Sequence, residues 1–129
     1  MLAVDTNLIV RLLANDNAAQ TLRAAALFAN EQIYLSKTVL LESEWVLRFS
    51  YELPPQIILQ ALRSLVGLPN VVLEQQREIA EALDGFQQGL DFADALHLAG
   101  SRRAGRFATF DKKLLKRAEK LTDIELVLV

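Results

Sequence analysis

Short apolar runs alternate with longer segments of helical periodicity along this 129-residue chain. The apolar runs are rich in Val, Ile, Leu and Phe, which favours strands, and they lie at residues 2–5, 33–36, 71–74, 106–110 and 124–129. We expect helices between them, at residues 7–13, 18–30, 37–51, 56–66, 76–88, 92–103 and 112–120. Because parallel strands are connected through helices, this order predicts an α/β fold with a parallel sheet covered by helices on both faces.

The composition is that of one soluble domain. There is no cysteine, which excludes a disulfide framework, thiolate metal sites and a cysteine nucleophile. No apolar run reaches the roughly 20 residues that a transmembrane helix needs, and the N-terminus lacks the pattern of a signal peptide. We therefore expect a single domain over residues 1–129, located in the cytoplasm. The net charge of −2 does not by itself indicate a nucleic acid partner.

Four carboxylates stand where apolar runs stop. Asp5 and Asp111 directly follow strand candidates, Glu42 lies about two turns into the helix after the second strand, and Asp94 lies near the start of the helix before the fourth. Parallel sheets bind ligands beyond the carboxyl ends of their strands. An acid there costs desolvation energy unless a positive charge sits beside it. We therefore expect the four acids to converge on a bound divalent cation.

Each acid also has an ordinary structural explanation. Asp5, Asp91 and Asp111 could each cap the helix that follows, which is the commonest use of an aspartate at such a point. The two residues after Asp5 are also good caps, so the first helix does not need Asp5 for that purpose. Asp94, in the first turn of its helix, would gain stability from the helix dipole.

Glu42 and Glu44 lie on the same predicted helix and cannot both face one site, because residues two apart project about 200° from each other. Glu44 has Arg48 four residues later, in the favourable order for an ion pair, which predicts a solvated surface pair. Glu42 has mainly apolar neighbours at three and four residues' distance and no basic partner. Glu42 is therefore the better ligand candidate.

The donor types favour a hard cation. Carboxylates suit Mg²⁺ or Mn²⁺, and Thr109, two residues before the last acid, could add a hydroxyl or orient a ligand water. His97 is the only histidine, so a zinc site is not expected, and we expect it near the site rather than as a ligand. The chain has no glycine-rich phosphate-binding motif.

At these residues the chain resembles a PIN domain, and specifically the small prokaryotic toxins of VapC type. The matching segments are LAVDTN at residues 2–7, LLE at 40–42, DFADALH at 91–97 and TFDKKL at 109–114. They cover essentially the whole chain in the family's order and spacing. The resemblance implies the PIN-domain fold, a five-stranded and mostly parallel sheet flanked by about seven helices.

The resemblance also implies a Mg²⁺-dependent endoribonuclease, with Mn²⁺ as a substitute. Asp5, Glu42, Asp94 and Asp111 would form its acidic site, with Asp91 as a further candidate ligand. Thr109 and Asn7 would be accessory residues. No position of the four main acids departs from the family pattern. Toxins of this size are usually homodimers, and a cognate antitoxin neutralises each by wrapping it, in some cases as a larger hetero-oligomer.

Clustered carboxylates with a hard metal suit phosphodiester hydrolysis by an activated water, with Glu42 either ligating the metal or acting as base. The products would carry 5′-phosphate and 3′-hydroxyl ends. RNA also needs positive surface near the acids, for which the candidates are Lys112, Lys113, Arg102 and Arg103. The predicted third and fourth helices carry surplus apolar residues, including Trp45, where we expect a dimer contact and an antitoxin groove.

Two other functions are compatible with the same residues. A metal-dependent phosphatase or phosphotransfer domain has a similar layout, but it usually carries a paired Asp-x-Asp nucleophile where this chain has Asp5-Thr6-Asn7. The other is a non-catalytic module that binds RNA or protein and holds a structural cation. The sequence does not select among tRNA, ribosomal RNA and mRNA as substrates.

Overall fold

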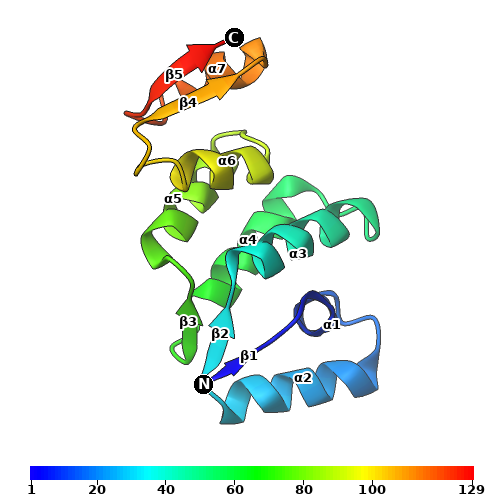
Figure 1. The fold of residues 1–129 in the computed structure, drawn as a ribbon. Coiled ribbons are helices and arrows are strands. Elements are labelled where there is room, and N and C mark those ends of the chain that lie inside the picture. Colours follow the sequence, from blue (N-terminus) through cyan, green and yellow to red (C-terminus); the bar gives the residue numbers. More distant parts are fainter. The chain divides into compact units, whose positions relative to one another are not determined.

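The computed structural model describes all of residues 1–129 and divides into two compact units, Met1–Gln75 and Gln76–Val129 (Figure 1). The first unit is built on a three-stranded parallel sheet in the order β1-β2-β3. These strands are β1 (Leu2–Ala3), β2 (Ile33–Leu35) and β3 (Val71–Leu73). Leu2 pairs with Ile33, which pairs in turn with Val71, so the three strands are in register at their first residues.

Two helices connect each pair of neighbouring strands in this unit. α1 (Thr6–Ala14) and α2 (Ala18–Asn30) lead from β1 to β2, and α3 (Lys37–Phe49) and α4 (Pro55–Val66) lead from β2 to β3. The central strand carries the core, because Ile33 and Leu35 are both completely buried. Apolar residues at helical spacing complete it, such as Ile58, Leu62 and Leu65 on α4.

The second unit consists of three helices and a small parallel sheet of two strands. Its elements are α5 (Gln76–Gln87), α6 (Phe92–Ala99), β4 (Arg106–Thr109), α7 (Lys112–Ala118) and β5 (Glu125–Leu128). β4 and β5 are parallel and are connected through α7. α5 and α6 approach closely at Gly85, where a Cβ atom would lie 3.2 Å from the Cβ of Ala95. Glycine therefore permits this helix contact.

The α/β class, the seven helices and the parallel pairing predicted from the sequence are confirmed. The expected elements all form, and most ends agree to within one or two residues. The sixth helix is shorter than expected because Gly100 ends it, its N–H donating to the carbonyl of Leu96. No helix in the structure is both long enough and apolar enough to cross a membrane.

The prediction of one five-stranded sheet is wrong for this structure, in which the strands form one sheet of three and one of two. Hydrogen bonding pairs each strand with the strand nearest in sequence within its own unit. The break falls between β3 and β4, at the boundary between the two units. Alternating strands and helices predict parallel pairing, but they do not determine which strands pair, since two helices connect β1 to β2 and β2 to β3 as well.

The orientation of α3 also corrects the sequence analysis. The predicted ion pair exists, with Arg48 Nε 2.9 Å from Glu44 Oε2 and Arg48 Nη2 donating to Glu44 Oε1 at 3.2 Å. The pair is not solvated, however, because the Glu44 side chain is only 1% exposed. α3 turns the face that carries Leu40, Ser43, Glu44 and Leu47 inward. Burial of a carboxylate is tolerable here because a guanidinium matches it with two contacts.

Removing this pairing should destabilise the first unit. We expect Glu44→Ala to lower the free energy of unfolding by about 2–4 kcal/mol, because the half-buried Arg48 loses its partner. Replacing both residues by apolar ones, as in Glu44→Met with Arg48→Leu, should recover much of the loss. Urea unfolding followed by circular dichroism measures both. Glu42→Gln, on the exposed side of the same helix, is the control, expected within about 0.5 kcal/mol of wild type. A Glu44→Ala protein as stable as wild type would show that the pair contributes nothing.

Candidate metal centre

Asp5 lies two residues beyond the end of β1, at the carboxyl edge of the three-stranded sheet. Its Oδ1 accepts the N–H of Leu8 at 3.0 Å, so Asp5 is the N-cap of α1. The expectation that this helix does not need Asp5 as a cap is therefore wrong. The cap occupies one carboxylate oxygen and the side chain remains exposed, which leaves Oδ2 accessible to another ligand. Capping and metal binding are thus compatible at this residue.

A second acid, Glu74, lies at the same edge, and the sequence analysis did not single it out. Glu74 directly follows β3, and its Oε1 accepts the N–H of Lys37, the first residue of α3, at 2.8 Å. The pattern that selects Asp5 and Asp111, an acid directly after an apolar run, also selects Glu74. The hydrogen bond to α3 gives Glu74 a structural role at the start of that helix.

Glu42 and Asn7 are both exposed. Glu42 lies on the solvent side of α3, opposite the buried Glu44, and its neighbours Thr38 and Trp45 are exposed as well. Of the apolar neighbours that favoured Glu42 as a ligand, Trp45 is exposed, and Val39 and Val46 are half-buried. Asn7 is in the first turn of α1. An exposed Glu42 remains able to bind a metal or a water.

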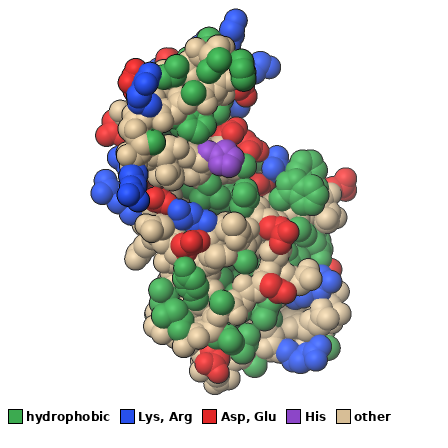
Figure 2. Space-filling view, viewed as in Figure 1, with side chains coloured by type: hydrophobic (Ala, Val, Ile, Leu, Met, Phe, Trp, Pro, Cys, Tyr) green, Lys and Arg blue, Asp and Glu red, His purple; other side chains and the backbone are tan.

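Three acids of the second unit influence one another electrostatically. Asp91 and Asp94 lie at the start of α6, and Asp111 follows β4. Burial raises the pKa of Asp94 above its ordinary value of 3.8, and the negative charges of Asp91 and Asp111 raise it further. His97, one turn later on α6, opposes this rise. Its imidazole is exposed, as Figure 2 shows for the only histidine (purple).

Asp111 caps α7 as Asp5 caps α1. Its Oδ1 accepts the N–H groups of Lys113 at 2.9 Å and Leu114 at 3.0 Å. Thr109 accepts the N–H of Asp111 through its hydroxyl at 2.9 Å, so it holds the backbone that presents this carboxylate. Asp91 occupies the N-cap position of α6 but makes no side-chain capping hydrogen bond. The capping role considered for it is therefore not observed.

The donor set fits a hard divalent cation by its chemistry. It consists of carboxylate oxygens, and the pKa of Asp94 is raised by burial first and then by the charges of Asp91 and Asp111. Neither unit by itself holds three or more His, Asp or Glu side chains arranged around one point. The structure thus supplies the ligand types and a concentration of charge in the second unit, rather than a preformed cluster there.

The candidate RNA-binding cations differ in their availability. Arg102 Nε lies 2.9 Å from Glu81 Oε2, and its Nη1 lies 3.3 Å from Asp123 Oδ1, so intramolecular acids already hold this guanidinium. This pairing argues against a role in binding phosphate. Lys112, Lys113 and Arg103 are exposed. Positive charge close to Asp111 therefore comes chiefly from the two lysines that follow it.

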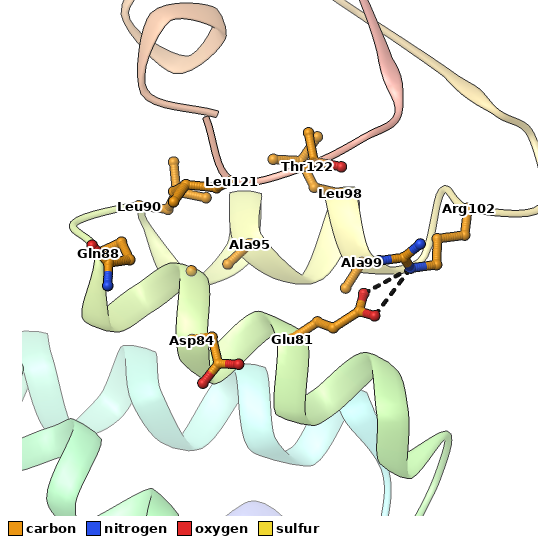
Figure 3. Close-up of a pocket in the computed structure, with 11 residues that line it drawn as sticks. Glu81, Asp84, Gln88, Leu90, Ala95, Leu98, Ala99, Arg102, Leu121 and Thr122 are labelled. Atoms are coloured by element: carbon orange, nitrogen blue, oxygen red, sulfur yellow. Dashed lines mark hydrogen bonds and ion pairs between the residues drawn. The ribbon is translucent and has the colours of Figure 1, made fainter. Parts of the chain in front are cut away.

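The same unit contains a cavity of about 140 Å³ between α5, α6 and the segment before β5 (Figure 3). Figure 3 shows the side chain of Glu81 reaching Arg102, which neutralises that acid. The α6 residues that line it are Ala95, Leu98 and Ala99, and none of the candidate ligand acids is among the lining residues. This cavity is therefore not the candidate metal centre.

The raised pKa of Asp94 predicts a pH-dependent cost in stability. The folded protein holds this proton more tightly than the unfolded chain, so stability decreases as pH rises from the ordinary value of 3.8 through the raised one. Asp94→Asn removes the charge and should stabilise the metal-free protein at about pH 7, with the gain lost below about pH 3. Urea unfolding in EDTA across this pH range measures the difference. An Asp94→Asn protein less stable than wild type at neutral pH would contradict the assigned cause.

Comparison with known proteins agrees with the resemblance seen in the sequence. A family model described as the PIN domain matches residues 2–121. A search of curated proteins finds no match. PIN domains are in general metal-dependent nucleases that use divalent cations. The match includes all four candidate acids and both units, and the chain belongs to the PIN-domain family.

Proposed function

We propose that this protein is a Mg²⁺-dependent endoribonuclease that acts as the toxin of a toxin–antitoxin pair. The observation that carries the nuclease proposal is the match to the PIN domain over residues 2–121, which includes Asp94, a half-buried acid whose pKa is raised by burial and by the charges of Asp91 and Asp111. Four acids, Asp5 and Glu42 with Asp94 and Asp111, serve the reaction, and Asp91 is a further ligand.

The bound cation would activate the attacking water and stabilise charge on the phosphate. Asp94 and Asp111 would hold it through carboxylate oxygens, and Asp111 has an oxygen left for this because its cap uses Oδ1 alone. Thr109 keeps the Asp111 backbone in place. Glu42 ligates the cation or accepts a proton from water. Cleavage then leaves a 5′-phosphate and a 3′-hydroxyl, since the 2′-hydroxyl takes no part.

Substitution of the acids should abolish cleavage without loss of fold. We expect Asp5→Asn, Asp94→Asn and Asp111→Asn each to slow RNA cleavage in Mg²⁺ at least about a hundredfold, because each removes a negative ligand. Asn keeps an oxygen that can cap a helix, so α1 and α7 retain their N-caps. EDTA should stop the wild-type reaction, and excess Mn²⁺ should restore it. Labelled RNA resolved on gels gives the rates, and ligation assays identify the end groups.

Glu119→Gln is the matched control, an exposed acid at the other end of α7, and it should cleave at the wild-type rate. A 2′,3′-cyclic phosphate product would refute the proposed chemistry. Cleavage that persists in the Asp5 and Asp94 variants would remove those residues from the site. Stabilisation by Mg²⁺ with no cleavage of any RNA would instead support a binding module with a structural cation.

The toxin proposal extends to partners. The family resemblance supports a cognate antitoxin, a homodimer and RNA as the substrate, with tRNA among the candidate targets. Growth arrest on expression, relieved by the product of a neighbouring small reading frame, tests the pairing. Sequencing the 5′ ends of cellular RNA after brief expression identifies the target.

An exposed aromatic pair on α3 supports a protein partner. Trp45 and Phe49 are 53% and 57% exposed, and their ring centroids lie 5.0 Å apart. The guanidinium of Arg48 lies 4.6 Å from the centre of the Phe49 ring. Figure 2 shows hydrophobic side chains (green) at the surface of the first unit. Two neighbouring exposed aromatic rings are typical of interface anchors.

Truncating this pair should weaken the partner complex. We expect Trp45→Ala to lower antitoxin affinity at least about tenfold, because a large ring that would be buried in the interface is lost. The unfolding free energy should stay nearly constant, since the ring is half exposed in the free protein. Calorimetry with the purified antitoxin measures the affinity, and light scattering measures the dimer. Unchanged affinity together with an unchanged dimer would remove Trp45 from both interfaces.

A further inference from the structure

Phe110 is the most exposed large apolar side chain of the protein, at 81% exposure. It lies between the last residue of β4 and Asp111, the acid that caps α7. Such a large apolar side chain in water is unfavourable by itself, since full burial of a Phe contributes about 1.5–3 kcal/mol. The position of this ring next to a candidate catalytic acid therefore calls for an explanation.

The backbone around Phe110 fixes the outward direction of its ring. Along β4, exposure alternates, with Phe107 and Thr109 half-buried and Ala108 exposed, and Phe110 continues this alternation on the exposed side. Pairing of Thr109 with Leu128 holds the register. The N–H of Asp111 donates to the Thr109 hydroxyl, and the N–H of Val129 donates to the Thr109 carbonyl. These contacts hold the backbone on either side of Phe110 and place its side chain on the exposed side of β4.

The groups beside Phe110 are those that bind an RNA strand. Lys112 and Lys113 follow within three residues, and both are exposed. Phe110 directly precedes Asp111, one of the candidate ligands, and both residues are exposed. Proteins that bind single strands combine cations that follow the phosphates with aromatic rings on which bases stack. Lysines adjacent to the ring favour a polyanion over an apolar protein surface.

We propose that Phe110 stacks on an unpaired nucleobase next to the scissile phosphate and thereby sets the nucleotide preference at that position. This inference rests on the proposed ribonuclease activity, and it assigns a specificity-determining residue to that site. A phenylalanine side chain has only two rotatable bonds, so the ring loses little conformational entropy on stacking. Lys112 and Lys113 would contact the flanking phosphates, which carry no sequence information.

The test measures the binding of labelled single-stranded RNAs of about 12 nucleotides to the Asp94→Asn protein, which holds substrate without cleaving it. Phe110→Ala should weaken binding between about fivefold and a hundredfold, the range for loss of one base–aromatic stack. Phe110→Trp should bind within about threefold of the parent, and RNA should quench its fluorescence beyond the signal of Trp45, the only native tryptophan. Leu22→Ala is the control, because it truncates a similarly exposed apolar side chain on α2, and it should leave the RNA affinity unchanged.

An abasic ribose moved along the RNA locates the stacked base. At one position the abasic ribose should weaken binding to the Asp94→Asn protein as much as the added Phe110→Ala substitution does. At that position it should cause no further loss of affinity in the protein that carries Phe110→Ala. In the cleaving protein, Phe110→Ala should flatten the nucleotide preference beside the cut.

Three outcomes would overturn the inference. The first is an unchanged RNA affinity and cleavage pattern in Phe110→Ala, which leaves the ribonuclease proposal standing. The second is a Phe110→Ala protein that loses only dimer formation or antitoxin binding, which would assign the ring to a protein interface. The third is a wild-type protein that binds no RNA. RNA that quenches Phe110→Trp but is never cleaved with any divalent cation would instead reject the ribonuclease and retain the stacking contact.

Discussion

The first N–H groups of each helix need an acceptor, and where a short strand is followed almost directly by a helix, the connecting residue supplies it. Asp5 supplies it for α1, Ser36 for α3 and Asp111 for α7. Each such cap contributes about 1 kcal/mol. The same requirement places carboxylates at the carboxyl ends of β1 and β4, where ligands of parallel strands bind. The fold and the proposed chemistry therefore depend on the same carboxylates, Asp5 and Asp111, whose Oδ1 atoms accept hydrogen bonds from the first N–H groups of the helices.

This double role affects how a substitution is interpreted. Alanine at Asp5 or Asp111 removes both the cap and the charge, so a loss of activity could follow from a frayed helix. Asparagine keeps a capping oxygen and removes only the charge, because Asn and Asp are similarly good N-caps. Only the asparagine variants therefore separate the electrostatic contribution of these residues from their contribution to helix stability.

The sequence predicts the positions of helices and strands well because periodicity and turn residues are local. Side-chain burial is harder to predict from the sequence. The spacing shows that Glu42 and Glu44 lie on different faces of α3. Both have apolar residues nearby, so the pattern does not determine which of the two is buried. Sheet composition is not local either, since the strands are connected through one or two helices. The pairing of Arg102 with Glu81 spans 21 residues and leaves no mark in the spacing of charges.

Burial and charge pairing separate the acids of this protein into two groups. Glu44 is matched by Arg48, Glu81 by Arg102 and Asp16 by Arg11. At Asp16 a hydrogen bond from Tyr51, together with the charge of Arg11, lowers the pKa of the carboxyl.

Asp94 belongs to the other group. Its pKa is raised by burial and by the charges of two further acids, with only His97 acting in the opposite direction. A carboxylate kept only for stability would gain from an arginine, as the matched acids do. A half-buried carboxylate beside other acids would instead be stabilised by a bound cation. The unfavourable free energy of the charged Asp94 in the metal-free protein would then be relieved on binding and would add to the affinity for the metal.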